Sequence, residues 1–147
     1  MTEKALAGIS RSNALKLLKK HLKNEKLVSH CIPSEAIMRA LAQRCGKDED
    51  SWGIAGLLHD IDYELTDEDP GRHEAEAAEI LLANGISEDI VEAIKNHNAE
   101  GLGLERSTLF DYALACSEAI TGLIVATALV YPDKKIASVK PKSVTKR

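Results

Sequence analysis

The chain has 147 residues, of which 44% are hydrophobic and 29% charged, a composition that suits one globular domain and excludes a disordered or fibrous protein. Its formal net charge of −4 gives no general attraction for nucleic acid, and its five aromatic residues are too scattered to form a base-stacking surface. We therefore do not expect nucleic acid as its partner.

The charge is unevenly divided along the chain. Residues 132–147 carry six basic side chains and one aspartate, a net charge of +5, so residues 1–131 carry −9. We expect a helical domain over residues 1–131 and a basic C-terminal tail over residues 132–147. Such a tail can bind phosphate groups, but a solvated terminus is the simpler interpretation.

Helix signals appear in order along the chain. The first helix should follow Ser10 or Ser12, with leucines on one face and lysines on the other. The second should run from about residue 24 to residue 44 and end before Gly46, with Pro33 kinking or restarting it. The third should cover about residues 51–59, behind the acidic residues 48–50.

The second half of the chain predicts three more helices. One should begin at Asp69-Pro70, an N-cap followed by proline, and stop at Asn84-Gly85. Ser87 should cap the next, which runs to about residue 97, and the last should follow Ser107 and continue to about residue 130. Six helices joined by short polar loops predict an all-α, single-domain bundle.

The longest apolar run, residues 119–130, is too short to cross a bilayer and includes two threonines, so we expect a buried core helix and no membrane contact. The three cysteines, Cys31, Cys45 and Cys116, lack zinc-finger spacing, and the start of the chain does not have the pattern of a signal peptide. These features predict reduced thiols and a cytoplasmic protein.

Four histidines share an unusual placement, each on the inner stripe or at the end of a different predicted helix: His30, His59, His73 and His97. A lone buried histidine is usually a hydrogen-bonded core residue. Four imidazoles in one interior are costly to desolvate unless each has a partner, and a divalent cation is a partner for all of them. Asp60 and Glu118 would add oxygen donors, although Glu118 could instead pair with a lysine at a groove edge.

The segment GLLHDIDY (56–63) and the order of the blocks around it resemble the HD domain superfamily of metal-dependent phosphohydrolases. Residues 59–62, which begin with the pair His59-Asp60, resemble the HDIG-type branch, with Asp62 where that signature has glycine. The other matching blocks, NEKLVSHCIPSEAIMRALA, HEAEAAEILLANG and SEAITGLIVATALVYP, extend the resemblance over nearly the whole chain. The resemblance implies the HD fold.

The resemblance also implies a metal site. It makes His30, His59 and Asp60 metal ligands, and it places Glu118 where the family pattern usually has aspartate. His73 and His97 match positions that hold a second ion in two-metal members and face the substrate in one-metal members. The mixed donors suit Mn, Fe, Co, Ni or Zn.

The number of ions is a separate prediction. Many two-metal members place another histidine directly after the one that matches His97, and this chain has Asn98 there. We therefore expect one tightly bound ion and a weaker second.

The activity implied by the resemblance is hydrolysis of a phosphomonoester or phosphodiester by a metal-activated water, with a nucleotide or a related small phosphate as substrate. His73 or His97, if not bound to metal, is expected to act as general acid. Asp62 is expected to orient the water or a histidine, or else to solvate its loop. Arg72 is expected to clamp a phosphate, or else to remain solvated.

Two alternatives remain open at this point. The first is a non-catalytic sensor that keeps the metal or nucleotide site, and glutamate in place of the usual aspartate at position 118 favours it. The second is a di-iron oxygenase of the HD fold, which requires His73 and His97 both to bind iron. A count of bound metal and a phosphatase screen would separate the three.

Overall fold

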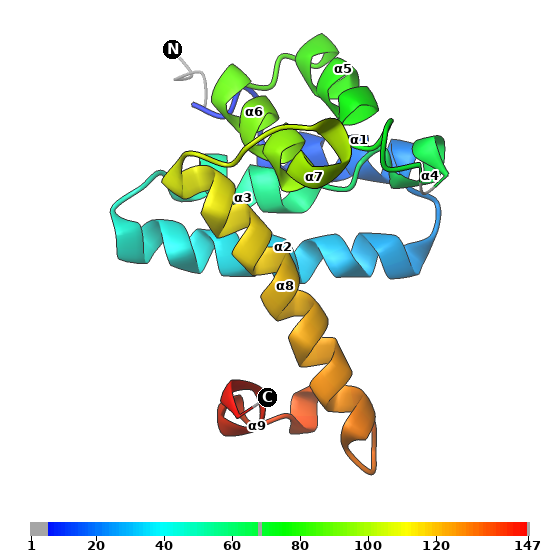
Figure 1. Cartoon of the computed structure of the whole chain (residues 1–147), viewed down its shortest axis with the longest axis vertical. Helices are drawn as coiled ribbons and strands as arrows, with labels where there is room; N and C mark the ends of the chain where they lie inside the picture. The colour runs from blue at the N-terminus through cyan, green and yellow to red at the C-terminus, as the bar shows by residue number, and fades with distance from the viewer. Residues whose placement is uncertain (1–5, 68, 147) are drawn as a thin grey trace.

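The computed structural model describes residues 6–67 and 69–146, and it is all-α (Figure 1). No strand occurs within these ranges. Six helices of nine or more residues form the framework: α1 (Arg11–His21), α2 (Glu25–Cys45), α3 (Glu49–Leu58), α5 (Ala75–Ala83), α6 (Glu88–His97) and α8 (Leu109–Val130). The predicted all-α bundle is confirmed, and these are its six predicted helices.

Four of the long helices start where a side chain caps the backbone. Ser10, rather than Ser12, accepts a hydrogen bond at the start of α1, and Asn24 and Asp48 do the same for α2 and α3. At α8 the cap is Thr108, one residue after the predicted Ser107, and it forms a capping box with Asp111. Polar residues thus set these starts to within two or three positions of the prediction.

Four short elements were not predicted: α4 (Tyr63–Thr66), α7 (Ala99–Leu102), the 3₁₀ helix η1 (Ile136–Ser138) and α9 (Pro141–Thr145). The last two lie in the basic tail and contact α8. The Tyr131 hydroxyl lies 2.6 Å from the Ser143 hydroxyl, and α9 lies beside the lower half of α8 (Figure 1). The tail therefore folds back on α8, and its described lysines remain exposed to solvent.

The helix α3 is the centre of the fold. All its residues from Ser51 to Leu58 are buried, and it packs against α1, α2, α6 and α8. Gly56 lets the backbones of α3 and α2 approach closely, because a Cβ added there would lie 2.6 Å from the Ser34 carbonyl oxygen. The C-terminal end of α3 consequently lies inside the molecule, and the residues that follow it, His59 and Asp60, are buried.

The helix α2 continues through Pro33 as one element, so of the predicted kink or restart the restart is wrong. Proline removes one backbone donor from a helix but leaves the neighbouring turns bonded. His30 and Ser34 on either side of it both face the bundle: the Ser34 hydroxyl lies 3.4 Å from the Thr121 hydroxyl of α8.

The predicted helix start at Asp69-Pro70 is also wrong, because α5 begins at Ala75. Glu74 has a φ of 71°, a left-handed conformation that a right-handed helix does not contain. A tertiary contact holds it there: the buried Asp62 Oδ2 accepts the N–H of Glu74 at 2.6 Å and that of Ala77 at 3.0 Å. His73 therefore lies on a turn ahead of α5 and not within a helix.

The expectation of a buried core helix over residues 119–130 is wrong for the second half of α8. The first half packs among the other helices, whereas the second half extends beyond them (Figure 1) and exposes Val125, Leu129 and Val130. By length and composition α8 meets the criterion for a membrane-spanning helix, with a mean hydropathy of 1.9 and 33% of the tested window buried. Core helices of globular proteins meet the same criterion, so this is weak support for a membrane.

Candidate metal centre

His59 and Asp60 immediately follow α3 and are buried at its end. The Nδ1 atom of His59 lies 2.7 Å from the Gly56 carbonyl oxygen, which can only accept, so Nδ1 carries the ring proton. In the neutral ring, the Nε2 atom presents its lone pair to the interior, where it has no hydrogen-bond partner. An unpartnered imidazole nitrogen is costly to bury, but it is the arrangement of a metal ligand whose other nitrogen is held by a carbonyl.

The two oxygens of Asp60 face two different pairs of histidines. Oδ2 lies 3.3 Å from His59 Nε2 and 3.7 Å from His30 Nε2. Oδ1 lies 3.3 Å from His73 Nε2 and 3.8 Å from His97 Nε2. A single carboxylate is thus placed between two half-sites, each with two imidazoles.

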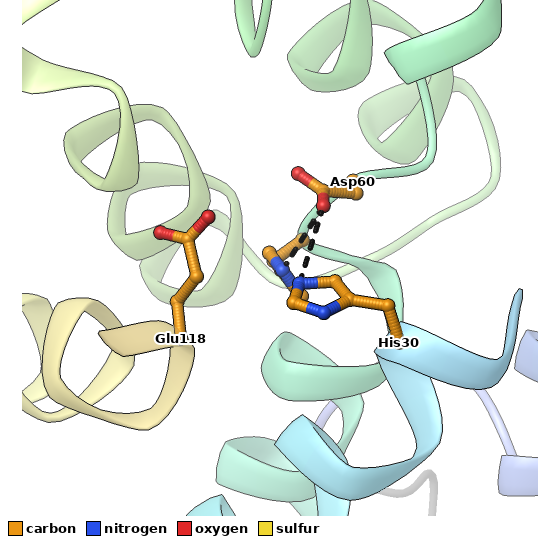
Figure 2. A group of neighbouring side chains, drawn as sticks. His30, Asp60 and Glu118 are labelled. Carbon is orange, nitrogen blue, oxygen red and sulfur yellow. Dashed lines mark ion pairs between the residues drawn. The ribbon is translucent and has the colours of Figure 1, made fainter. Parts of the chain in front are cut away.

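Glu118 faces the first half-site from the opposite side. Figure 2 shows His30 reaching Asp60 from α2, with Glu118 across from them on α8. One donor atom each from His30, His59, Asp60 and Glu118 lies within 4.8 Å of the others. The structure therefore brings together the four residues of the predicted metal set, although they come from α2, α8 and the end of α3.

The second half-site is built around His73. Its Nδ1 atom lies 2.7 Å from Asp62 Oδ1, and Asp62 is completely buried, which excludes a loop-solvating role. A carboxylate that accepts the Nδ1 proton of histidine fixes the ring and directs Nε2 outward. The donor atoms of Asp60, His73, Glu74 and His97 form a second group within 4.8 Å.

His97 ends α6 and is nearly buried. Its Nδ1 atom lies 3.2 Å from Glu118 Oε2, so Glu118 borders both half-sites. Arg106 supports this end of the cluster by donating to the His97 carbonyl oxygen at 2.7 Å and pairing with Glu100. Sequence reasoning missed Arg106, because nothing in its neighbourhood along the chain marks it.

Arg72 does not belong to this cluster by contact. Half of its side chain is exposed, and its guanidinium lies 3.2 Å from Glu76 Oε1 in the next helical turn. Arg72 is thus solvated and locally paired in this structure, and its role as a phosphate clamp stays a prediction. The guanidinium of Arg106, by contrast, reaches the backbone of His97, and its buried Nε atom has no hydrogen-bond partner.

Comparisons with known proteins place this arrangement in a family. The HD domain model matches residues 27–127, which is more than two thirds of the chain and contains all four clustered histidines. The chain belongs to the HD domain family. It is also similar to Ribonuclease Y of Pseudothermotoga lettingae, with 33% identity over 76 residues that make up 52% of this chain and 15% of that relative. No solved structure matches it.

The electrostatics of this HD domain suit a cation. Burial opposes a charged His59, yet Asp60, Gly56 and Glu74 raise its pKa to about 9. Burial likewise opposes a charged His73, yet Asp60, Asp62 and Glu74 raise its pKa to about 12. Without metal, protons therefore balance the crowded carboxylates. A divalent ion of the kind that HD domains bind fits the same position and the same donors.

Metal binding to this HD domain should release protons. A pH of 7 lies below the raised pKa values of His59 and His73. Both rings therefore carry protons that an incoming ion must displace. Lowering the pH adds competing protons, so the apparent affinity for Mn²⁺ should rise between about pH 6 and pH 8, by up to roughly tenfold per unit for each proton released. Titration calorimetry in two buffers with different ionisation enthalpies measures the release; heats that are the same in both buffers would contradict it.

Proposed function

We propose that this HD domain is a cytoplasmic, metal-dependent phosphohydrolase that cleaves a phosphate ester in a nucleotide or a related small molecule. The observation that carries the proposal is the position of Asp60, with one oxygen toward His30 and His59 and the other toward His73 and His97. Divalent ions at such a site activate water and neutralise the charge on phosphoryl oxygens. Membership of a family of metal-dependent phosphohydrolases supports the same conclusion.

The pKa values favour ligand roles for His73 and His97 over the role of general acid. Burial lowers the pKa of His97 to about 3, so His97 is neutral near pH 7 and has no proton to give. The pKa of His73, about 12 without metal, is far from the range in which proton transfer is efficient. Both imidazoles can bind an ion when neutral, and Asp62 already holds the His73 ring in one orientation.

A groove beside the cluster supports a small organic phosphate as substrate. It has a volume of about 500 Å³, lies between α2 and α8, and is lined by Glu25, Lys26, Ser29, His30, Pro33, Thr121, Val125 and Ile136. Most of the surface of this groove is apolar, which suits a base or another carbon-rich group, while Lys26 and Glu25 add one charge of each sign. His30 belongs both to the groove and to the first half-site, so a molecule in the groove would reach the cluster.

The similarity to Ribonuclease Y bears on which type of phosphate ester bond the protein cleaves. The name of that relative describes an enzyme that acts on RNA, whose backbone is a chain of phosphodiesters. Because the matched segment is 15% of that relative, RNA itself is not carried over. The charge of −9 over residues 1–131 also disfavours a long polyanion, so a short phosphodiester is the better candidate.

A metal assay combined with a substrate screen tests the proposal. The purified protein is analysed for metal content, then incubated with Mn²⁺ and a panel of nucleotides, cyclic dinucleotides and phosphomonoesters. We expect metal-dependent cleavage of at least one phosphate ester, abolished by a chelator. Bound metal without hydrolysis would favour the sensor instead, and bound iron with oxygen consumption would favour the oxygenase.

A further inference from the structure

Three candidate ligands of the second half-site are Asp60, His73 and His97, and a fourth has to be identified. The residue that follows His97 is Asn98, and its side-chain amide donates to the carbonyl oxygens of Pro70 at 2.8 Å and His73 at 2.9 Å. Asn98 therefore fastens the turn that carries His73 to the end of α6. Its amide nitrogen is thus engaged with the backbone, and it offers no imidazole to the second half-site.

Glu74 adds a carboxylate to the group formed by Asp60, His73 and His97. Its side chain is completely buried, and neither carboxylate oxygen has a hydrogen-bond partner. Oε1 lies 2.9 Å from His73 Nε2, close enough for contact but without hydrogen-bond geometry. A buried carboxylate without donors is strongly disfavoured unless a cation or a proton neutralises it.

The surrounding chain keeps Glu74 in this position. Asp62 binds the backbone N–H of Glu74 and holds the adjacent His73 ring, so both side chains are fixed by one buried carboxylate. Glu74 is one residue from His73 in the sequence but is brought beside Asp60 and His97 by the left-handed turn.

We propose that Glu74 is the carboxylate ligand of a second divalent ion, which shares Asp60 with the first. Each half-site then has two imidazoles and two carboxylates: His30, His59, Asp60 and Glu118 in one, and Asp60, His73, Glu74 and His97 in the other. Equal donor sets give comparable affinities, in contrast to the one tight ion expected from Asn98. This inference rests on the proposed metal-dependent function, but it concerns the number of ions and not the reaction.

Manganese titration of the metal-free protein tests the role of Glu74. Free Mn²⁺ is counted by electron paramagnetic resonance, which also detects magnetic coupling between two bound ions. The wild-type chain should bind two Mn²⁺ ions with similar affinities and show coupling. Glu74→Gln keeps the size of the side chain but removes its charge, so the second step should weaken by about 100-fold and the coupling should disappear.

Two further variants keep the result interpretable. Glu79→Gln, at an exposed position on the same helix, should bind two ions like the wild type. Glu74→Gly suits the left-handed backbone and should fold even if Glu74→Gln does not, and it should bind one ion. Two wild-type steps in both Glu74 variants, or a single step in the wild type, would overturn the inference and leave the first site intact. No binding by the wild type would also remove the proposed function.

Discussion

Asp60→Asn is expected to abolish metal-dependent hydrolysis and most metal binding while leaving the helices intact. Both oxygens of Asp60 face pairs of imidazoles, so the loss of its charge weakens both half-sites at once. We expect activity to fall by roughly 1,000-fold or more, at the upper end of what the loss of one preorganised electrostatic contact costs. Phosphate release, Mn²⁺ titration and circular dichroism measure the three effects.

The fold should survive because it does not depend on Asp60. The core consists of apolar side chains on the long helices, among them Leu18, Met38, Leu57 and Ile94. At saturating metal the variant should lose only the stabilisation that the ion provides, about 3–4 kcal/mol for concentrations 100 to 1,000 times the dissociation constant. Asp89→Asn, at an exposed position on α6, is the matched control and should retain full activity. Wild-type hydrolysis by Asp60→Asn would refute the proposed function.

Gly56→Ala is expected to destabilise the protein by about 2–3 kcal/mol and to weaken metal binding. The added methyl group would lie 2.6 Å from the Ser34 carbonyl oxygen and 2.9 Å from the Glu35 nitrogen. Both are backbone atoms, which a side-chain rotation cannot move away, so α3 and α2 must separate. The separation also displaces the Gly56 carbonyl that holds His59, and it moves His30 away from Asp60.

Gly122→Ala is expected to stabilise the protein, although it makes the same replacement of glycine by alanine as Gly56→Ala. Gly122 lies inside α8, and a Cβ there would meet no atom within 4 Å. Alanine should therefore stabilise the protein by about 0.5–1 kcal/mol through its higher helix propensity. Chemical denaturation of the two variants gives both values. Equal effects in the two variants would show that the close approach of α2 and α3 at Gly56 has no special importance.

The long helices could be predicted because each is specified locally. Apolar periodicity places α1, α2 and α6, and polar caps such as Ser10, Asn24 and Asp48 place the starts of α1, α2 and α3. The signal at Asp69-Pro70 failed because the Asp62 carboxylate, 12 residues before Glu74, binds the backbone N–H of Glu74 and delays the start of α5. The second half of α8 was misjudged because apolar composition does not reveal which other helices are present to cover it.

The convergence of the histidines could be predicted from the same patterns, since each lies on an inner stripe or at a helix end. His30, His59, Asp60 and Glu118 converge as their positions suggested. Glu74 and Arg106 could not be found in this way. Glu74 enters the cluster only because its backbone adopts a left-handed turn, and Arg106 reaches His97 from a loop. Neither feature leaves a periodic trace in the sequence.

The buried carboxylate of Asp62 acts as a template that chooses between two folds of one short segment. Residues 70–74 carry the local signals of a first helical turn, but a right-handed helix that started at Pro70 would not contain the left-handed backbone of Glu74. By binding His73, Glu74 and Ala77 together, Asp62 selects the turn instead. The glycine that the related HDIG signature has at this position could not make these contacts. In this chain, therefore, one buried carboxylate sets both the placement of His73 and Glu74 in the second half-site and the first residue of α5, so a substitution of Asp62 should alter the two together.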